Sequence, residues 1–178
     1  MTWWYLLAVV AMLALGAWLY STANRLDRLH HRIDVARGSL DTQLLHRSGT
    51  SLELASSEVL DPPRSLLLLE AAREARSAPR GDFEDAESDL SAVLRAVLSD
   101  PTEVRSFKED PVVGQLMAEL ADDCRKVELA RRFHNDIVAS ARDLRSRRRV
   151  HWMGLAGRAP EPATVNFDDA PPQALVED

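Results

Sequence analysis

Residues 3–20 read WWYLLAVVAMLALGAWLY, a run of 18 residues without a charged side chain. As an α-helix, a run of this length spans about 27 Å, close to the ~30 Å hydrocarbon core of a bilayer. Amphipathic aromatic rings are typical of both membrane interfaces, and here they stand at both ends of the run. They are Trp3, Trp4, Tyr5, Trp18 and Tyr20. The sequence therefore predicts a transmembrane anchor over residues 1–20.

Two other interpretations of this run are weaker. A helix buried in a protein core is one alternative, because the run is apolar on every face. A cleaved signal peptide is the other, but such peptides carry a basic segment before a shorter apolar run and small residues at the cleavage site. Only Met1 and Thr2 precede this run, and bulky residues end it. An uncleaved single-pass anchor fits best.

The flanks of the run predict its orientation. No Lys or Arg precedes it, whereas Arg25, Arg28, Arg32 and Arg37 follow it closely. Basic residues favour the cytoplasmic side of a membrane. We therefore expect the protein in the cell membrane, with its N-terminus outside, the rest of the chain in the cytoplasm, and membrane lipid as a partner.

The remaining chain predicts an all-α fold. Apolar residues recur at steps of three and four from Leu26 to about Leu60, and helical patterns follow at residues 65–78, 82–99 and 112–150, with one turn near 102–107. We expect the anchor to continue into a long-helix antiparallel, up-and-down four-helix bundle over residues 21–152. The two short helices either reverse direction or run end to end, and the Pro79-Arg80-Gly81 break favours reversal. Residues 153–178, rich in Pro and acids, are expected to be mostly disordered.

The net charge, the single cysteine and the absence of known motifs limit the classes of function open to this protein. The chain has 22 basic and 28 acidic residues and a net charge of −6, which argues against nucleic acid as the main partner. The single cysteine, Cys124, excludes an internal disulfide and lies on an apolar stripe, as expected of a small buried hydrophobe. No nucleotide-binding, hydrolase or metal-ligand motif occurs. We expect no enzymatic activity, no cofactor and no metal.

Three blocks of the chain resemble the LemA family of bacterial membrane proteins. They are residues 24–44 directly after the anchor, residues 69–76, and residues 120–138. The resemblance implies a single-pass protein with a helical-bundle domain and no established enzymatic activity. Arg131, His134 and Asn135 lie at family-matching positions, although the family usually has Tyr-Asn where this chain has His134-Asn135. The segment 46–52 also departs from the family pattern, since it lacks the family's proline and acid.

Five arginines cluster near the end of the last predicted helix: Arg142, Arg145, Arg147, Arg148 and Arg149. Cations stabilise a helix C-terminus through its dipole, which is the simplest explanation. Contact with anionic lipid, a protein partner or nucleic acid is the functional alternative.

The sequence thus favours a non-enzymatic, membrane-tethered interaction or scaffold module at the cytoplasmic face, with unidentified protein partners. A tether for nucleic acid or anionic lipid through residues 145–149 is one alternative. An enzyme whose active site shows no recognisable motif is another. Self-association through the heptad-like seam after the anchor also stays open, because the seam residues serve intramolecular packing equally well.

Overall fold

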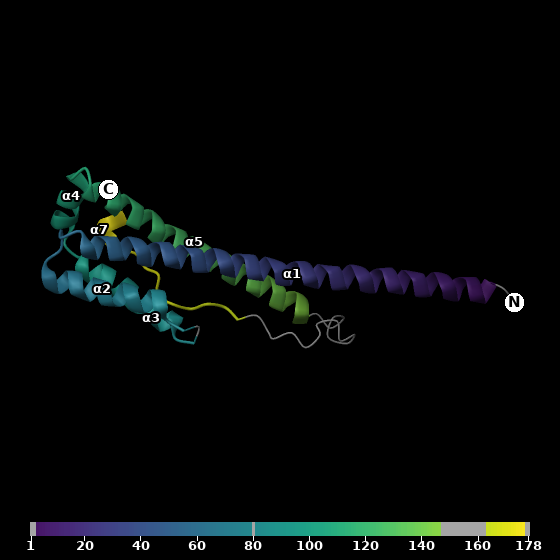
Figure 1. Cartoon of the computed structure of the whole chain (residues 1–178). Coiled ribbons are helices and arrows are strands. Elements are labelled where there is room, and N and C mark those ends of the chain that lie inside the picture. The colour runs from purple at the N-terminus through teal and green to yellow at the C-terminus, as the bar shows by residue number, and fades with distance from the viewer. Residues whose placement is uncertain (1–2, 80, 147–162, 177–178) are drawn as a thin grey trace. The chain divides into compact units, whose positions relative to one another are not determined.

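The computed structural model describes residues 3–79, 81–146 and 163–176, and within these ranges it forms helices and no strand. The helices are α1 (Trp3–Ser56), α2 (Pro62–Ser77), α3 (Phe83–Val97), α4 (Pro101–Glu109), α5 (Val113–Ser146) and α7 (Gln173–Val176) (Figure 1). The prediction of an all-α fold is confirmed for the described residues, and each predicted helix is present there with ends that differ by a few residues. The predicted end of the last helix near residue 150 lies outside the described residues.

Aspartates followed by prolines set two of the helix starts. The Asp61 side chain accepts a hydrogen bond from the backbone N–H of Arg64, with prolines in the first turn of α2. Asp100 does the same for Thr102 at the start of α4. These caps satisfy amide groups that have no partner within the helix. Asp82 precedes α3, but its side chain makes no capping hydrogen bond.

The end of α1 differs from the sequence prediction. The helix stops at Ser56 rather than near Leu60. The Ser56 hydroxyl donates to the carbonyl of Leu52, the Ser57 hydroxyl donates to that of Leu54, and Glu58 adopts a left-handed φ of 60°. A left-handed residue cannot continue a right-handed helix, so the chain turns there toward α2.

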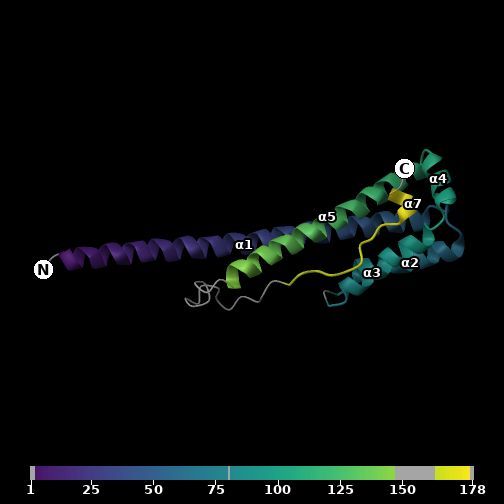
Figure 2. The ribbon, with the colours of Figure 1, turned by 180° about the vertical axis from the view of Figure 1, so that it is seen from behind.

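The chain divides into two units, the larger comprising residues 37–134 and 165–178 and the smaller comprising residues 1–36 and 135–164. In the larger unit α2 and α3 are antiparallel neighbours: Arg64 at the start of α2 donates to the Val97 carbonyl at the end of α3, over 3.3 Å. Figure 2 shows the same pairing from behind. The short helices therefore reverse direction, which was the alternative that the sequence favoured.

The core of the larger unit is formed by one face of each helix. Its fully buried side chains come from α1 to α5, with Leu175 of α7 added from the end of the chain; they include Leu54, Leu68, Leu90, Leu94, Val104, Met117 and Leu120. A second cluster joins α1 to α5 through Leu40, Leu44 and Val127. Burial of this apolar area is the main force that holds the helices together.

The C-terminal segment corrects the sequence prediction. Residues 165–176, which we call the strap, are ordered against the larger unit and end in α7, which contacts α4 (Figure 1). Val165, Phe167 and Asp169 are buried, whereas Asn166 and Asp168 are exposed. The prediction of disorder is wrong for these residues, because side chains remote in the sequence hold them in place. Residues 153–162, 177 and 178 of the predicted tail lie outside the described ranges.

The smaller unit contains the apolar run with which the sequence begins. Trp3, Trp4, Tyr5 and Tyr20 are 72–80% exposed and Trp18 is 39% exposed; Val9, Val10, Met12 and Leu13 are also exposed. When only the described residues are counted, no helix reaches both the length and the hydropathy that a membrane crossing requires. The anchor over residues 1–20 stays a prediction.

Candidate functional site

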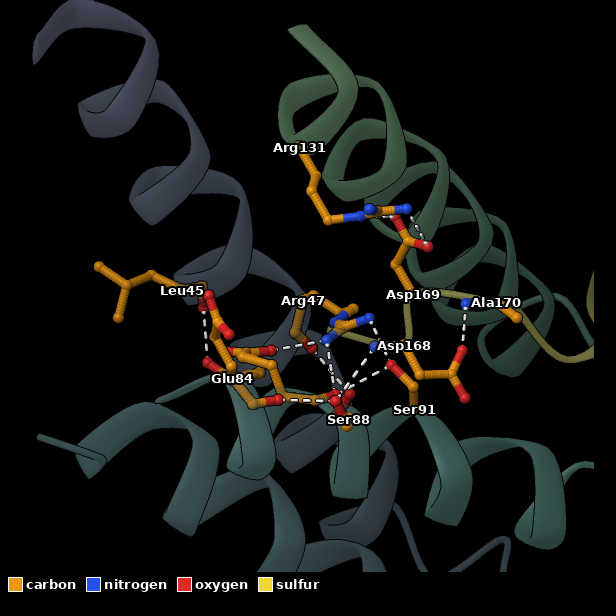
Figure 3. A network of polar contacts seen from close by, with 12 residues as sticks. Leu45, Arg47, Glu84, Ser88, Ser91, Arg131, Asp168, Asp169 and Ala170 are labelled. Carbon is orange, nitrogen blue, oxygen red and sulfur yellow. Dashed lines mark hydrogen bonds and ion pairs between the residues drawn. The ribbon is translucent and has the colours of Figure 1, made fainter. Parts of the chain in front are cut away.

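A buried ion pair joins α1 to α3 within the larger unit. Arg47 of α1 is 1% exposed and Glu87 of α3 is 3% exposed, and their charged groups meet at 2.6 Å. Ser91, one turn beyond Glu87, accepts a hydrogen bond from Arg47 at 3.0 Å (Figure 3). Arg47 also donates to the Glu87 backbone carbonyl at 3.2 Å. The pair therefore fastens α1 to α3 at one register.

The electrostatics of this pair are those of a desolvated site. Burial raises the pKa of the Glu87 carboxyl above its ordinary value, and the neighbouring Arg47 guanidinium opposes that rise. Within the described residues, the Nε of Arg47 has no hydrogen-bond partner. Removing one partner of such a pair is far more costly than replacing both, because it leaves a lone buried charge.

A second buried polar contact joins α1 to α5. The Thr50 hydroxyl donates to the Asp123 carboxylate at 2.7 Å, and both residues are at least 94% buried. The adjacent Cys124 is 1% exposed, and burial raises the pKa of its thiol to about 11. The prediction that Cys124 is a buried hydrophobe is confirmed, and its thiol is held in the unreactive neutral form.

The strap contacts both α3 and α5, and we call the residues of these helices that hold it the groove: Phe83, Glu84, Ser88, Arg95 and Arg131. Arg131 of α5 binds both carboxylate oxygens of Asp169, at 2.6 and 2.9 Å (Figure 3). Arg95 of α3 binds the Asp168 carboxylate at 2.5 Å and the Ala170 carbonyl at 2.8 Å. Two arginines on two helices thus hold two consecutive aspartates of the strap.

Backbone contacts and aromatic packing complete the groove. The backbone N–H groups of Asn166 and Asp168 donate to side-chain oxygens of Glu84 and Ser88 on α3, at 3.1 and 3.0 Å. The Phe167 ring meets the Phe83 ring edge to face, with centroids 6.4 Å apart. The guanidinium of Arg37 lies over the Phe83 ring and that of Arg131 over the Phe167 ring, at 4.4 and 5.7 Å from the ring centroids.

An open pocket of about 210 Å³ lies beside this region, between α1, α2 and α3. Its walls carry both signs of charge, because Asp41 and Glu87 face it together with Arg37 and Arg76. Asp41 already pairs with Arg37 at 2.9 Å, and Glu87 pairs with Arg47. The pocket therefore selects no single charge type of small ligand.

The structure places the residues singled out from the sequence in different environments. Arg131 proves to be the main anchor of the strap, whereas His134 is 3% exposed within the larger unit and Asn135 lies in the smaller unit. Arg142 is half-buried, and the side chain of Arg145 is not described. Arg147, Arg148 and Arg149 lie outside the described residues.

Sequence reasoning missed the ion pair and the strap. Arg47 could have been noticed, because Leu40, Leu44, Arg47, Ser51 and Leu54 recur at steps of four and three, which places an arginine on the buried stripe. Arg47 and the other buried polar residues of α1, Ser48, Thr50 and Ser51, all lie within the segment 46–52. For the strap the available signal was the alternation Val165, Phe167, Asp169, typical of extended backbone with one covered face.

The fold and the site define a class: an all-α helical bundle fastened by a buried ion pair and closed by its own C-terminal strap. No protein-family model, no curated protein and no solved structure matches the chain.

Proposed function

We propose that the protein is a non-enzymatic interaction module tethered to the cytoplasmic face of the cell membrane, and that the resemblance to the LemA family reflects this role. The observation that carries the proposal is the uncharged run 3–20, whose large apolar side chains are exposed along α1. Contiguous apolar surface of this kind is typical of a membrane or protein contact. The four arginines that follow the run favour a cytoplasmic position for the bundle.

The bundle itself supports a binding role rather than a reaction. Its polar core residues, Arg47, Glu87 and Asp123, are at least 96% buried, and each already binds another side chain of the bundle. The single thiol is buried and neutral near pH 7. What the larger unit offers to solvent is the outer surface of a packed helical bundle, which can serve as a docking surface for partners.

Membrane fractionation tests the tether. We expect the full chain to remain with membranes in high salt and alkaline carbonate and to be released only by detergent. A variant with Leu7→Arg and Leu13→Arg places two charges in the run and should shift the protein to the soluble fraction. A matched variant with Asp34→Arg, which changes an exposed residue beyond the run, should stay with the membranes. Recovery of the unmodified chain in the soluble fraction contradicts the proposal.

Topology and partners need separate measurements. Protease added to intact cells should leave the strap epitope intact, whereas protease added to lysed cells should remove it. In-cell crosslinking of the full chain, followed by mass spectrometry, should recover membrane-localised proteins. Absence of any crosslinked protein would remove the interaction half of the proposal and leave the tether.

A further inference from the structure

We propose that the groove between α3 and α5 is a binding site for an extended acidic segment of a partner protein, and that the strap is its resident competitor. The proposal deepens the interaction role proposed above and rests on it. The segment recognised would carry the pattern of the strap: an apolar residue, an aromatic residue two positions later, and then two acids.

The chemistry of the groove defines this ligand. Arg131 binds Asp169 through a two-pronged contact, the geometry by which a guanidinium recognises a carboxylate most specifically. Arg95 adds a second carboxylate contact one residue earlier in the strap. A segment that carries two consecutive acids therefore meets two arginines placed to receive them.

The groove binds the backbone of the strap as well as its side chains. The N–H groups of Asn166 and Asp168, two residues apart, donate to Glu84 and Ser88, one turn apart on α3. Such contacts require an extended chain but do not by themselves select the side chain at either position. Between them, Phe167 is 5% exposed and packs against Phe83. Selectivity thus comes from the aromatic residue and the acids.

The strap is held by contacts that a competitor can replace one at a time. Arg95 and Asp168 have side chains 33% and 44% exposed, so their ion pair contributes little to stability. Val165, Phe167 and Asp169 are buried against the groove, and Pro172 and Leu175 are buried further along the strap. Because the strap belongs to the same chain, its effective concentration is on the order of millimolar, and a free peptide competes only when the strap is weakened.

The test uses the full chain in detergent and a fluorescently labelled peptide of residues 163–176 as probe. A strap-weakened variant, Phe167→Ser with Asp169→Lys, leaves every groove residue intact. We expect this variant to bind the probe at least about tenfold more tightly than the unmodified chain does. Adding Arg131→Gln to the variant should weaken binding at least about tenfold, as should making the Phe167→Ser and Asp169→Lys changes in the probe.

Each other outcome counts against the proposal. If the strap-weakened variant keeps its helices but fails to bind the probe, the strap is only a structural part of the fold. If the variant chains form dimers with unmodified chains by exchanging straps, the groove serves self-association and not a different partner. Failure of the fractionation test, by contrast, would leave probe binding unaffected, so the two proposals fail separately.

Hydrogen exchange on the unmodified chain decides the matter if the variant does not fold. We expect the amides of Asn166 and Asp168 to exchange by local opening, at least about tenfold faster than amides in the middle of α3. Exchange of both sets at the same rate would mean that the strap opens only on global unfolding. A partner could not then displace it, and the proposal would be wrong.

Discussion

Arg47 occupies a position on α1 where the neighbouring turns carry Leu40, Leu44 and Leu54. Its guanidinium is stabilised there only because Glu87 and Ser91 supply a charge and an acceptor. Replacing such a pair by apolar residues is often neutral, so the pair contributes register rather than net stability. We infer that it fixes how α1 and α3 align.

A pair of variants tests this at the residue scale. Arg47→Met leaves Glu87 buried without its counter-charge, and we expect a loss of about 3–5 kcal/mol in the free energy of unfolding. The double variant Arg47→Met with Glu87→Leu should recover most of that loss. Urea unfolding of the full chain in detergent, followed by circular dichroism, measures both. Equal losses in the two variants would show that the charge is not the cause.

Two glycines give a second residue-scale test. A Cβ atom on Gly114 would lie 2.5 Å from the Lys108 carbonyl oxygen, whereas one on Gly38 would meet nothing within 4 Å. Gly114→Ala should therefore destabilise the protein by about 1–3 kcal/mol, as overpacking does. Gly38→Ala, within α1, should stabilise it by about 0.5–1 kcal/mol, because alanine favours a helix interior. If both substitutions changed the free energy of unfolding in the same direction, the space around each glycine would not explain the effects.

At the scale of elements, the strap is bound by charges at defined positions. The Arg95 guanidinium, together with the Ala170 backbone N–H, lowers the pKa of the Asp168 carboxyl below its ordinary value of 3.8. A carboxyl whose pKa is lowered on folding contributes stability above its unfolded pKa and loses it as the pH falls through the folded value. The strap should therefore loosen in acid.

The strap variant Asp168→Asn isolates this effect from the other carboxyls. Above about pH 4 it should be slightly less stable than the unmodified chain, because an exposed ion pair contributes at most about 1 kcal/mol. As the pH falls below 3.8, the difference should vanish. Unfolding midpoints measured for both chains across pH 2–6 provide the comparison. A gap that widens in acid would mean that Asp168 is not stabilised as a carboxylate.

At the scale of the whole molecule, the single cysteine reports on cooperative opening. Cys124 lies in the core of the larger unit beside Thr50, Asp123 and the buried pair. Since its thiol is both covered and neutral, a thiol reagent reaches it only when the helices separate.

Maleimide labelling of Cys124 should therefore be slow in the unmodified chain. Its rate should rise in Arg47→Met by about tenfold for every 1.4 kcal/mol of stability lost, provided that opening is faster than labelling. The chain has one cysteine, so no background substitution is needed. Rapid labelling of the unmodified chain would show that the core opens locally around α5.

The sequence by itself determined the helices from α1 to α5 and the approximate positions of most of their ends. Apolar spacing and the Asp-Pro signals at residues 61 and 100 act within a few residues, so they can be predicted without knowing what lies opposite. The tertiary structure decided which side chains each helix face contacts. Arg47 meets Glu87 across 40 residues, and Arg131 meets Asp169 across 38. A tail rich in proline and acids predicts disorder when considered alone, but a groove with two arginines and a phenylalanine orders it, because the binding partners come from elsewhere in the chain.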